Sequence, residues 1–267
     1  MYALNNIART FLAAVYAFSY NDSNGSTSYS IFRGVRMNYL YLILLAVAPG
    51  AALIFFILLS DRYDHEPARL LVKIFVMGML VTLPTIVVEM LGQYFNVFSG
   101  LPGKAVEAFI VVGLSEEFFK RRVVLRYAYS HPAFNERMDG IVYCSIAALG
   151  FATLENIFYV ISYYAIQPDL WITRALVSVP VHMLLGIIMG YYLSLAKYCP
   201  HPGKCRGYMT KSLLIPALLH GAFDFVLMSD YPLLSLLFVP IVVYLWITSL
   251  IKLRKYYVES RIQHCGE

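Results

Sequence analysis

The sequence has 267 residues, of which 60% are hydrophobic and only 14% are charged, and its mean hydropathy is +0.65. A soluble domain needs about a quarter of its residues charged to cover its surface, so this composition excludes a soluble globular protein. The formal net charge of +5 does not indicate nucleic-acid binding, because the basic residues lie in short loops between apolar segments.

The first 36 residues differ from the rest. Their apolar patch at about residues 11–19 is too short to span a bilayer, and no convincing signal-peptide cleavage site follows it. An interfacial helix is the favoured interpretation of this N-terminal extension, residues 1–36. We expect one membrane-embedded domain over residues 37–252 and a cytoplasmic tail over residues 253–267.

Candidate membrane spans follow in chain order, each near the length of about 20 residues that a helix needs to cross the hydrocarbon core. They cover about residues 38–59, 70–91, 104–125, 140–164, 171–195, 211–229 and 231–251. The sequence therefore predicts an all-α, polytopic transmembrane helical bundle of about seven spans in the cell membrane.

Lysine and arginine gather in alternate loops of this arrangement. The basic positions are Arg62, Arg69 and Lys73 around the first loop, Lys120, Arg121, Arg122, Arg126 and Arg137 around the third, Lys197, Lys204, Arg206 and Lys211 around the fifth, and Lys252, Arg254, Lys255 and Arg261 in the tail. The positive-inside rule then places the odd-numbered loops and the C-terminus in the cytoplasm. Arg33 and Arg36 favour the opposite orientation, but the regular alternation outweighs them.

Ionisable side chains recur inside the predicted spans. A carboxylate or imidazole at membrane depth costs several kcal/mol unless it is paired, solvated or bound to metal, so each is a candidate for function. The set consists of Glu89, Glu107, Glu116, Glu117, Glu155, His182, His220 and Asp224.

Glu116 and Glu117 are adjacent, so on a helix they point about 100° apart. Lys120 and Arg121 follow them by four residues, which puts each base on the same face as one acid. The alternative interpretation is a charged helix end that snorkels to the interface.

Glu155 and His182 lie well inside the fourth and fifth spans. Gly186 and Gly190 follow His182 at four and eight residues, a small-residue stripe that favours close helix approach. For either polar residue the alternative is a structural hydrogen bond to a neighbouring helix.

His220 and Asp224 are four residues apart in the sixth span and share one face. A histidine with a carboxylate one turn away suits a metal site or an oriented general base. A buried ion pair is the structural alternative.

Together these residues predict one wet cavity in which four consecutive spans meet. Two histidines with carboxylates are a ligand set suited to Zn²⁺, and a spare glutamate can act as base toward water. The same groups can also hydrolyse a peptide without metal, with Asp224 or Asn156 orienting their partners.

Several strings in residues 38–251 resemble the PrsW family of intramembrane proteases, which is distantly similar to the CAAX-protease and bacteriocin-processing superfamily. They are Ala48-Pro-Gly, Asp61-Arg-Tyr-Asp-His-Glu-Pro67, Glu116-Glu-Phe-Phe-Lys120, Gly150-Phe-Ala-Thr-Leu-Glu-Asn156, His182 and His220-Gly-Ala-Phe-Asp224. The last four, in order and each in its own span, are the specific part of the pattern.

The resemblance implies a membrane-embedded, metal-dependent endopeptidase that cleaves a membrane-anchored protein, such as an anti-sigma factor at its first cleavage site. Glu116 and Glu117 would be essential acids, with either one more suited than Glu155 to take a proton from water. His182 and His220 would be metal ligands or catalytic donors, and Glu155 and Asp224 would complete the site.

Two other functions are compatible with the residues alone. Chains of membrane-embedded acids and histidines relay protons in transporters, although transporters more often show internal repeats and broken helices. A non-catalytic membrane scaffold or immunity factor is the second alternative.

Overall fold

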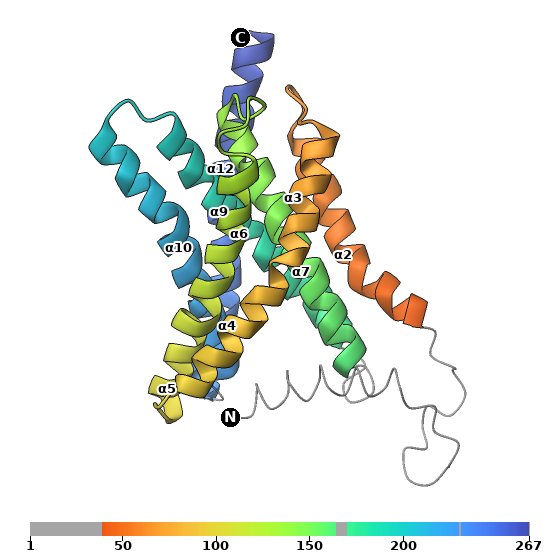
Figure 1. Ribbon diagram of the computed structural model, residues 1–267, viewed down its shortest axis with the longest axis vertical. Coiled ribbons are helices and arrows are strands. Elements are labelled where there is room, and N and C mark those ends of the chain that lie inside the picture. Colours follow the sequence, from red (N-terminus) through yellow and green to blue (C-terminus); the bar gives the residue numbers. More distant parts are fainter. Residues whose placement is uncertain (1–38, 164–169, 230, 267) are drawn as a thin grey trace.

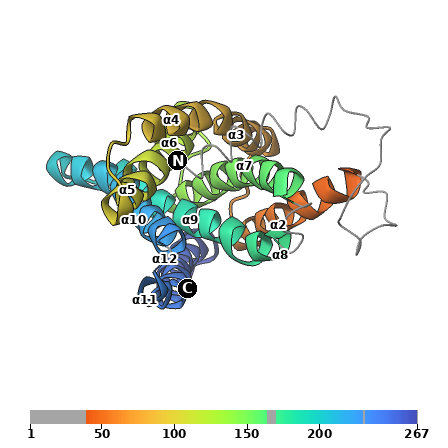
Figure 2. The ribbon, with the colours of Figure 1, turned by 90° about the horizontal axis from the view of Figure 1, so that it is seen from below.

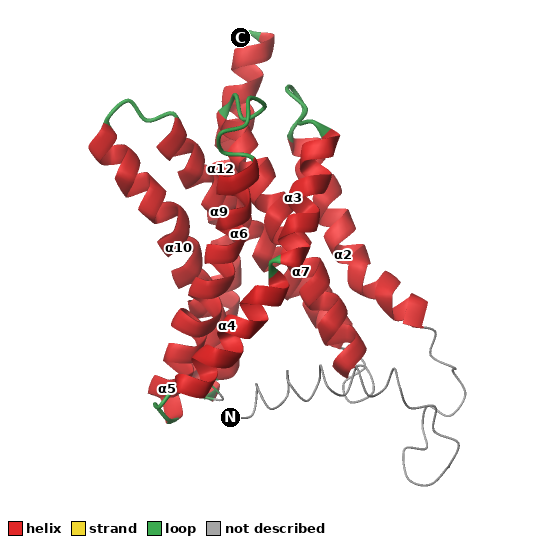
Figure 3. Cartoon of the chain, viewed as in Figure 1, coloured by secondary structure: helices red, strands yellow, loops and turns green. Residues whose placement is uncertain are grey.

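The computed structural model describes residues 39–163, 170–229 and 231–266. The N-terminal extension, and with it the predicted interfacial helix, lies outside the described residues. The described helices, in chain order, are α2 (Tyr39–Ser60), α3 (Ala68–Leu80), α4 (Thr82–Phe95), α5 (Gly100–Val106), the π-helix η1 (Glu107–Leu114), α6 (Ser115–Tyr127), α7 (Arg137–Tyr163), α8 (Leu170–Thr173), the π-helix η2 (Arg174–Ser178), α9 (Val179–Lys197), α10 (Pro202–Met228), α11 (Pro232–Ser235) and α12 (Phe238–Cys265). The described part of the chain contains helices and loops and no strand, which confirms the predicted all-α class (Figure 3).

Within the described residues, six helical stretches are long and apolar enough to cross a membrane. They are Leu40–Ser60, Ala68–Phe95, Arg137–Tyr163, Arg174–Lys197, Pro202–Met228 and Pro232–Cys265. The remaining predicted span lies in the run α5–η1–α6, which extends along the bundle beside the others (Figure 1). Its second half carries the Glu116–Arg122 charges, so its composition alone does not mark it as a span.

Helices α7 and α9 form the centre of the bundle, as the view along it shows (Figure 2). Residues 138–153 of α7 and 179–190 of α9 are buried without interruption. The outer helices α2, α4 and α12 instead expose large apolar side chains such as Leu44, Val87 and Ile251. This apolar exterior suits hydrocarbon, which solvates it without the cost that water would impose.

The glycine stripe of α9 lets α7 approach closely, as the sequence predicts. A Cβ atom added at Gly190 would overlap the carbonyl group of Gly140, and one added at Gly186 would lie 2.9 Å from the carbonyl oxygen of Cys144. Without side chains at these positions the two backbones are in direct contact, which fixes the register between the helices.

Loops that the sequence assigns to one side of the membrane lie at one end of the bundle. The α2–α3, α6–α7 and α9–α10 connections and the C-terminus are all at the upper end in Figure 1. We call this the loop end. The common location agrees with the alternation of basic loops, whereas the side of the membrane that it faces stays a prediction.

Substitution of Gly190 by alanine should destabilise the bundle, because the added methyl group has no space between α7 and α9. Overpacking of this kind costs about 1–3 kcal/mol or more. Gly207→Ala in α10 is the matched control, since a Cβ there meets no atom within 4 Å and alanine favours helix by about 1 kcal/mol. Thermal unfolding in detergent should show a lower melting temperature for Gly190→Ala alone; equal melting temperatures would contradict the close packing.

Candidate active site

The structure brings together all of the predicted site residues from four helices. Glu116 and Glu117 lie in the first turn of α6, Glu155 lies on α7, His182 on α9, and His220 and Asp224 on α10. Glu116, Glu117, His182 and His220 are buried.

Close contact between α10 and η1 places His220 beside the α6 acids. A Cβ atom added at Gly113 would lie 2.8 Å from both the Ala217 carbonyl oxygen and the Gly221 nitrogen, and one at Gly221 would lie 2.6 Å from the Phe109 ring. Glycine at both positions therefore permits the backbone approach that the His220 contacts require.

His182 bonds outward through one ring nitrogen and faces the site with the other. Its Nε2 lies 3.0 Å from Glu155 Oε2, and its Nδ1 lies 3.9 Å from Glu116 Oε2. The carboxylate on the outer nitrogen orients the ring, which leaves Nδ1 directed to the centre.

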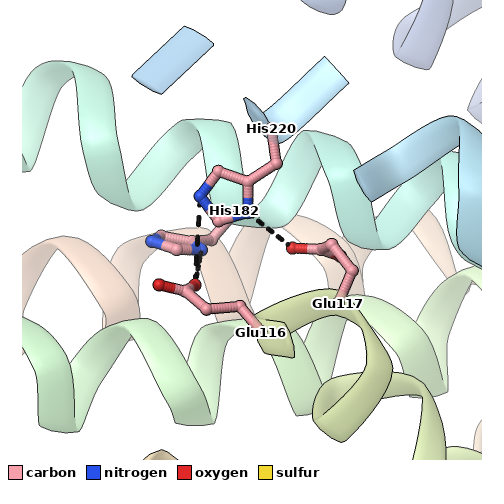
Figure 4. A group of neighbouring side chains, drawn as sticks. All are labelled: Glu116, Glu117, His182 and His220. Carbon is pink, nitrogen blue, oxygen red and sulfur yellow. Dashed lines mark hydrogen bonds and ion pairs between the residues drawn. The ribbon is translucent and has the colours of Figure 1, made fainter. Parts of the chain in front are cut away.

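His220 likewise contacts Glu117 through one ring nitrogen and lies near Glu116 with the other (Figure 4). Its Nδ1 lies 3.0 Å from Glu117 Oε1, while its Nε2 lies 3.9 Å from Glu116 Oε2 and 3.4 Å from Asp224 Oδ2. One oxygen of Glu116 is therefore equally distant from the central nitrogen of each histidine.

Lys120 supplies the positive charge at this centre. Its ammonium donates to Glu116 Oε2 at 2.9 Å and to Glu117 Oε1 at 2.8 Å, and it lies 2.9 Å from His182 Nδ1. The side chain is fully buried, so the interpretation of this segment as a snorkelling helix end does not hold. Arg121, which the spacing places on the face of Glu117, donates instead to Ser212 Oγ and the Met209 carbonyl on α10.

Arg174 is a second buried cation, which the sequence alone does not connect with the site. Its guanidinium lies 3.0 Å from Glu155 Oε2, and its Nε donates to Asn156 Oδ1 at 2.9 Å. Asn156 in turn donates to the Ala46 carbonyl of α2 at 2.8 Å. Sequence spacing gives no signal for this network, because Arg174 reaches α7 only through the fold.

Glu89 is a further buried acid that the sequence marks as polar in the membrane but does not assign to the site. It shares the inward face of α4 with Thr82 and Thr85, and its Oε1 accepts no hydrogen bond. Helix α4 packs against α6, the helix that carries Glu116 and Glu117. Among the described residues, no hydrogen bond or ion pair is seen between Glu89 and the histidines.

Comparison with known proteins identifies the class of enzyme. Residues 66–251 match the family model described as PrsW family intramembrane metalloprotease. The chain is 40% identical to Protease PrsW of Clostridioides difficile (strain 630) over 221 residues, which are 82% of this chain and 93% of that relative. The chain belongs to the PrsW family.

A second PrsW relative supports the same assignment. Protease PrsW of Bacillus subtilis (strain 168) is 36% identical over 211 residues, 78% of this chain and 92% of the relative. No solved structure matches the chain. PrsW membership makes the protein a membrane-embedded protease that acts on a protein substrate in the membrane, and it decides against the transporter and the scaffold.

The donor set of this PrsW protein fits a metal ion, as the description of the family as metalloproteases requires. One ligand atom from each of Glu116, Glu117, His182 and His220 lies within 4.8 Å of the others, and all of these residues are buried. Imidazole nitrogen and carboxylate oxygen are ligands of catalytic zinc sites. Three members of the set, Glu116, Glu117 and His182, already contact one cation, the Lys120 ammonium.

Removal of the Lys120 charge should destabilise the metal-free protein. Lys120→Met keeps the length of the side chain but leaves Glu116 and Glu117 as buried acids without their cation, which costs about 3–5 kcal/mol. Arg122→Met on the exposed face of α6 is the control, since it removes an equal charge from a solvated position. Thermal unfolding in the presence of a chelator measures both variants. Equal stability of the two would show that Lys120 does not neutralise the acids.

Proposed function

We propose that the protein is a zinc-dependent intramembrane endopeptidase whose catalytic centre lies between His182, His220 and the Glu116–Glu117 pair. The observation that carries this proposal is the geometry of the two histidines. Each bonds a carboxylate through one ring nitrogen and directs the other toward Glu116 Oε2, at 3.9 Å in both cases. Two oriented imidazoles with a central carboxylate are suited to hold a metal and to activate water.

His182, His220 and Glu117 would hold Zn²⁺, and the chemistry supplied by the bound ion is polarisation of the scissile carbonyl and activation of water. Glu116 takes the proton from water, because it lies between the two histidines and its side chain, unlike that of Glu117, retains some exposure. Glu155 acts as a positioning residue for His182 through the outer ring nitrogen, whereas Asp224 lies 3.4 Å from the inward Nε2 of His220 and completes the centre beside it.

The substrate we propose is a membrane-anchored protein, with an anti-sigma factor as the specific case. The apolar outer surface of the bundle lets such a substrate approach from within the bilayer. The basic loops lie together at the loop end, which supports a cytoplasmic C-terminus in the cell membrane.

Cleavage of a membrane-anchored substrate should depend on the central acids and histidines. Glu116→Gln, Glu117→Gln and His220→Ala should each lower the rate of peptide cleavage by at least about 100-fold, since each removes the base or a metal-holding group. Glu107→Gln is the matched control, because Glu107 precedes Glu116 on the same helical run but is no member of the donor set. The assay is conversion of a tagged substrate by reconstituted protein. Full activity in all three site variants would exclude this centre.

Metal content separates the zinc-dependent mechanism from one that uses glutamate and histidine alone. Elemental mass spectrometry of the purified wild-type protein should find about one zinc ion per chain. The double variant His182→Ala with His220→Ala should lose this zinc. Glu116→Gln should retain the metal while losing cleavage, because Glu116 acts as base. Near-zero zinc in the wild type would remove the metal from the mechanism, and loss of zinc from Glu116→Gln would make that residue a ligand.

A further inference from the structure

A second cluster of acids lies at the loop end, away from the active site. It consists of Asp61 and Glu66 from the α2–α3 connection and Glu136 and Asp139 from the start of α7. Asp139 precedes Glu155 by 16 residues on α7, which corresponds to about 24 Å along the helix. The acid cluster is therefore too far from the candidate active site to take part in peptide cleavage.

Hydrogen bonds fix the orientation of two members of the acid cluster. Asp139 Oδ2 accepts the backbone N–H groups of Asn135 and Glu136, both at 2.7 Å, and so caps the first turn of α7. The buried hydroxyl of Tyr143 donates to Glu66 Oε2. These contacts hold the carboxyl groups in place and leave Asp139 Oδ1 without a partner.

Several other oxygens of the acid cluster are buried without a hydrogen-bond partner. They are Oδ1 of Asp61, Oδ1 of Asp139 and both carboxyl oxygens of Glu136. These three residues are 3%, 0% and 4% exposed, so water does not reach them freely. A buried acceptor without a partner is costly, and a buried carboxylate more so, unless a proton or a cation compensates it.

Protein cations near the acid cluster are engaged elsewhere. Arg137 pairs with Glu259 at 3.1 Å, and Lys197 donates to the Tyr129 carbonyl. His264 comes within 3.7 Å of Glu136. Among the described residues, no lysine or arginine forms an ion pair with the other three acids of the cluster.

This environment raises the pKa values of two acids of the cluster. Burial, together with the negative charges of Asp139 and Glu136, raises the pKa of Asp61 to about 7. Burial also raises the pKa of Glu66 to about 9. Both pKa values are raised for the same reason: little positive charge surrounds the ionised carboxyl groups of Asp61 and Glu66.

We propose that the acid cluster binds one hard divalent cation, Ca²⁺ or Mg²⁺, through Asp61, Glu66 and Asp139, with Glu136 beside the entry. Oxygen-only donors suit these cations, whereas zinc prefers sites that include nitrogen or sulfur. Glu136 also lines a pocket of about 300 Å³ between α7 and α12, which brings solvent-accessible space to one edge of the acid cluster.

Binding would tie the α2–α3 connection to the start of α7. Among the described residues, only the active-site donors already form a set of three or more within 4.8 Å of one another. The carboxyl oxygens of the acid cluster must therefore move together around the ion. A cation that binds the folded state alone raises its stability in proportion to the logarithm of cation concentration.

The test is thermal unfolding of the full-length protein in detergent after chelation, with Ca²⁺ alone, Mg²⁺ alone or neither. We expect one or both cations to raise the melting temperature of the wild type, and calorimetric titration to show one site per chain. Asp61→Asn should raise the cation concentration at half-saturation by at least about tenfold. Glu66→Gln serves the same purpose if Asp61→Asn does not fold. Glu259→Gln, which removes a partly exposed acid at the same end, should keep the response.

The outcome is independent of the zinc centre, because the His182→Ala with His220→Ala variant should keep the Ca²⁺ or Mg²⁺ response. An equal response in wild type, Asp61→Asn and Glu66→Gln would overturn the proposal, since the cation would then bind elsewhere. The proposal would also be overturned if neither cation changed the melting temperature of the wild type while that temperature rose as the pH fell from 8 to 6. In that case protons, held by acids with raised pKa values, neutralise the cluster.

Discussion

Two buried cations, Lys120 and Arg174, hold the acids of the candidate active site inside the bundle. Lys120 bonds Glu116 and Glu117, and Arg174 lies 3.0 Å from Glu155. The buried acids outnumber the two fixed cations, since Asp224 and the neighbouring Glu89 have no lysine or arginine partner among the ion pairs of the described residues. Because removing either partner of a buried pair is far more costly than replacing both, the fixed cations constrain the acids and the acids constrain the fold.

Close backbone contacts make this charge arrangement possible. The Gly140–Gly190 contact sets α7 against α9, and the Gly113–Gly221 contact sets η1 against α10. A slip by one helical turn would displace His182 or His220 by about 5.4 Å and separate the imidazoles from Glu116. The glycines at these contacts therefore determine the helix register, and the register determines which ring nitrogens and carboxylate oxygens come together.

Hydropathy and polar spacing were sufficient to predict the class of fold and the acids and histidines that meet at the centre. Glu116, Glu155, His182 and His220 stand out because an ionisable group inside an apolar segment is energetically costly and is therefore a candidate for function. The spacing placed Lys120 on the face of Glu116, but it also fitted a helix end that snorkels to the interface. Arg174, near the start of a predicted span, was not connected with Glu155, because a basic residue near a span end also fits a solvated interface. The π-helical segments η1 and η2, which lead into Glu116 and His182, leave no recognisable sequence pattern, although such segments are frequent at functional sites.

Helix α7 carries acids toward both ends of its buried segment, and their surroundings differ in chemistry. Glu155 contacts an imidazole and a guanidinium, whereas the hydrogen bonds that Asp139 Oδ2 accepts come from backbone N–H groups. Nitrogen in the donor set favours zinc, and a set of carboxylates alone favours calcium or magnesium. Under the two proposals, the same residue type would support a zinc site at one position and a calcium or magnesium site at the other, because the neighbours of a carboxylate, more than the carboxylate itself, determine which cation it retains.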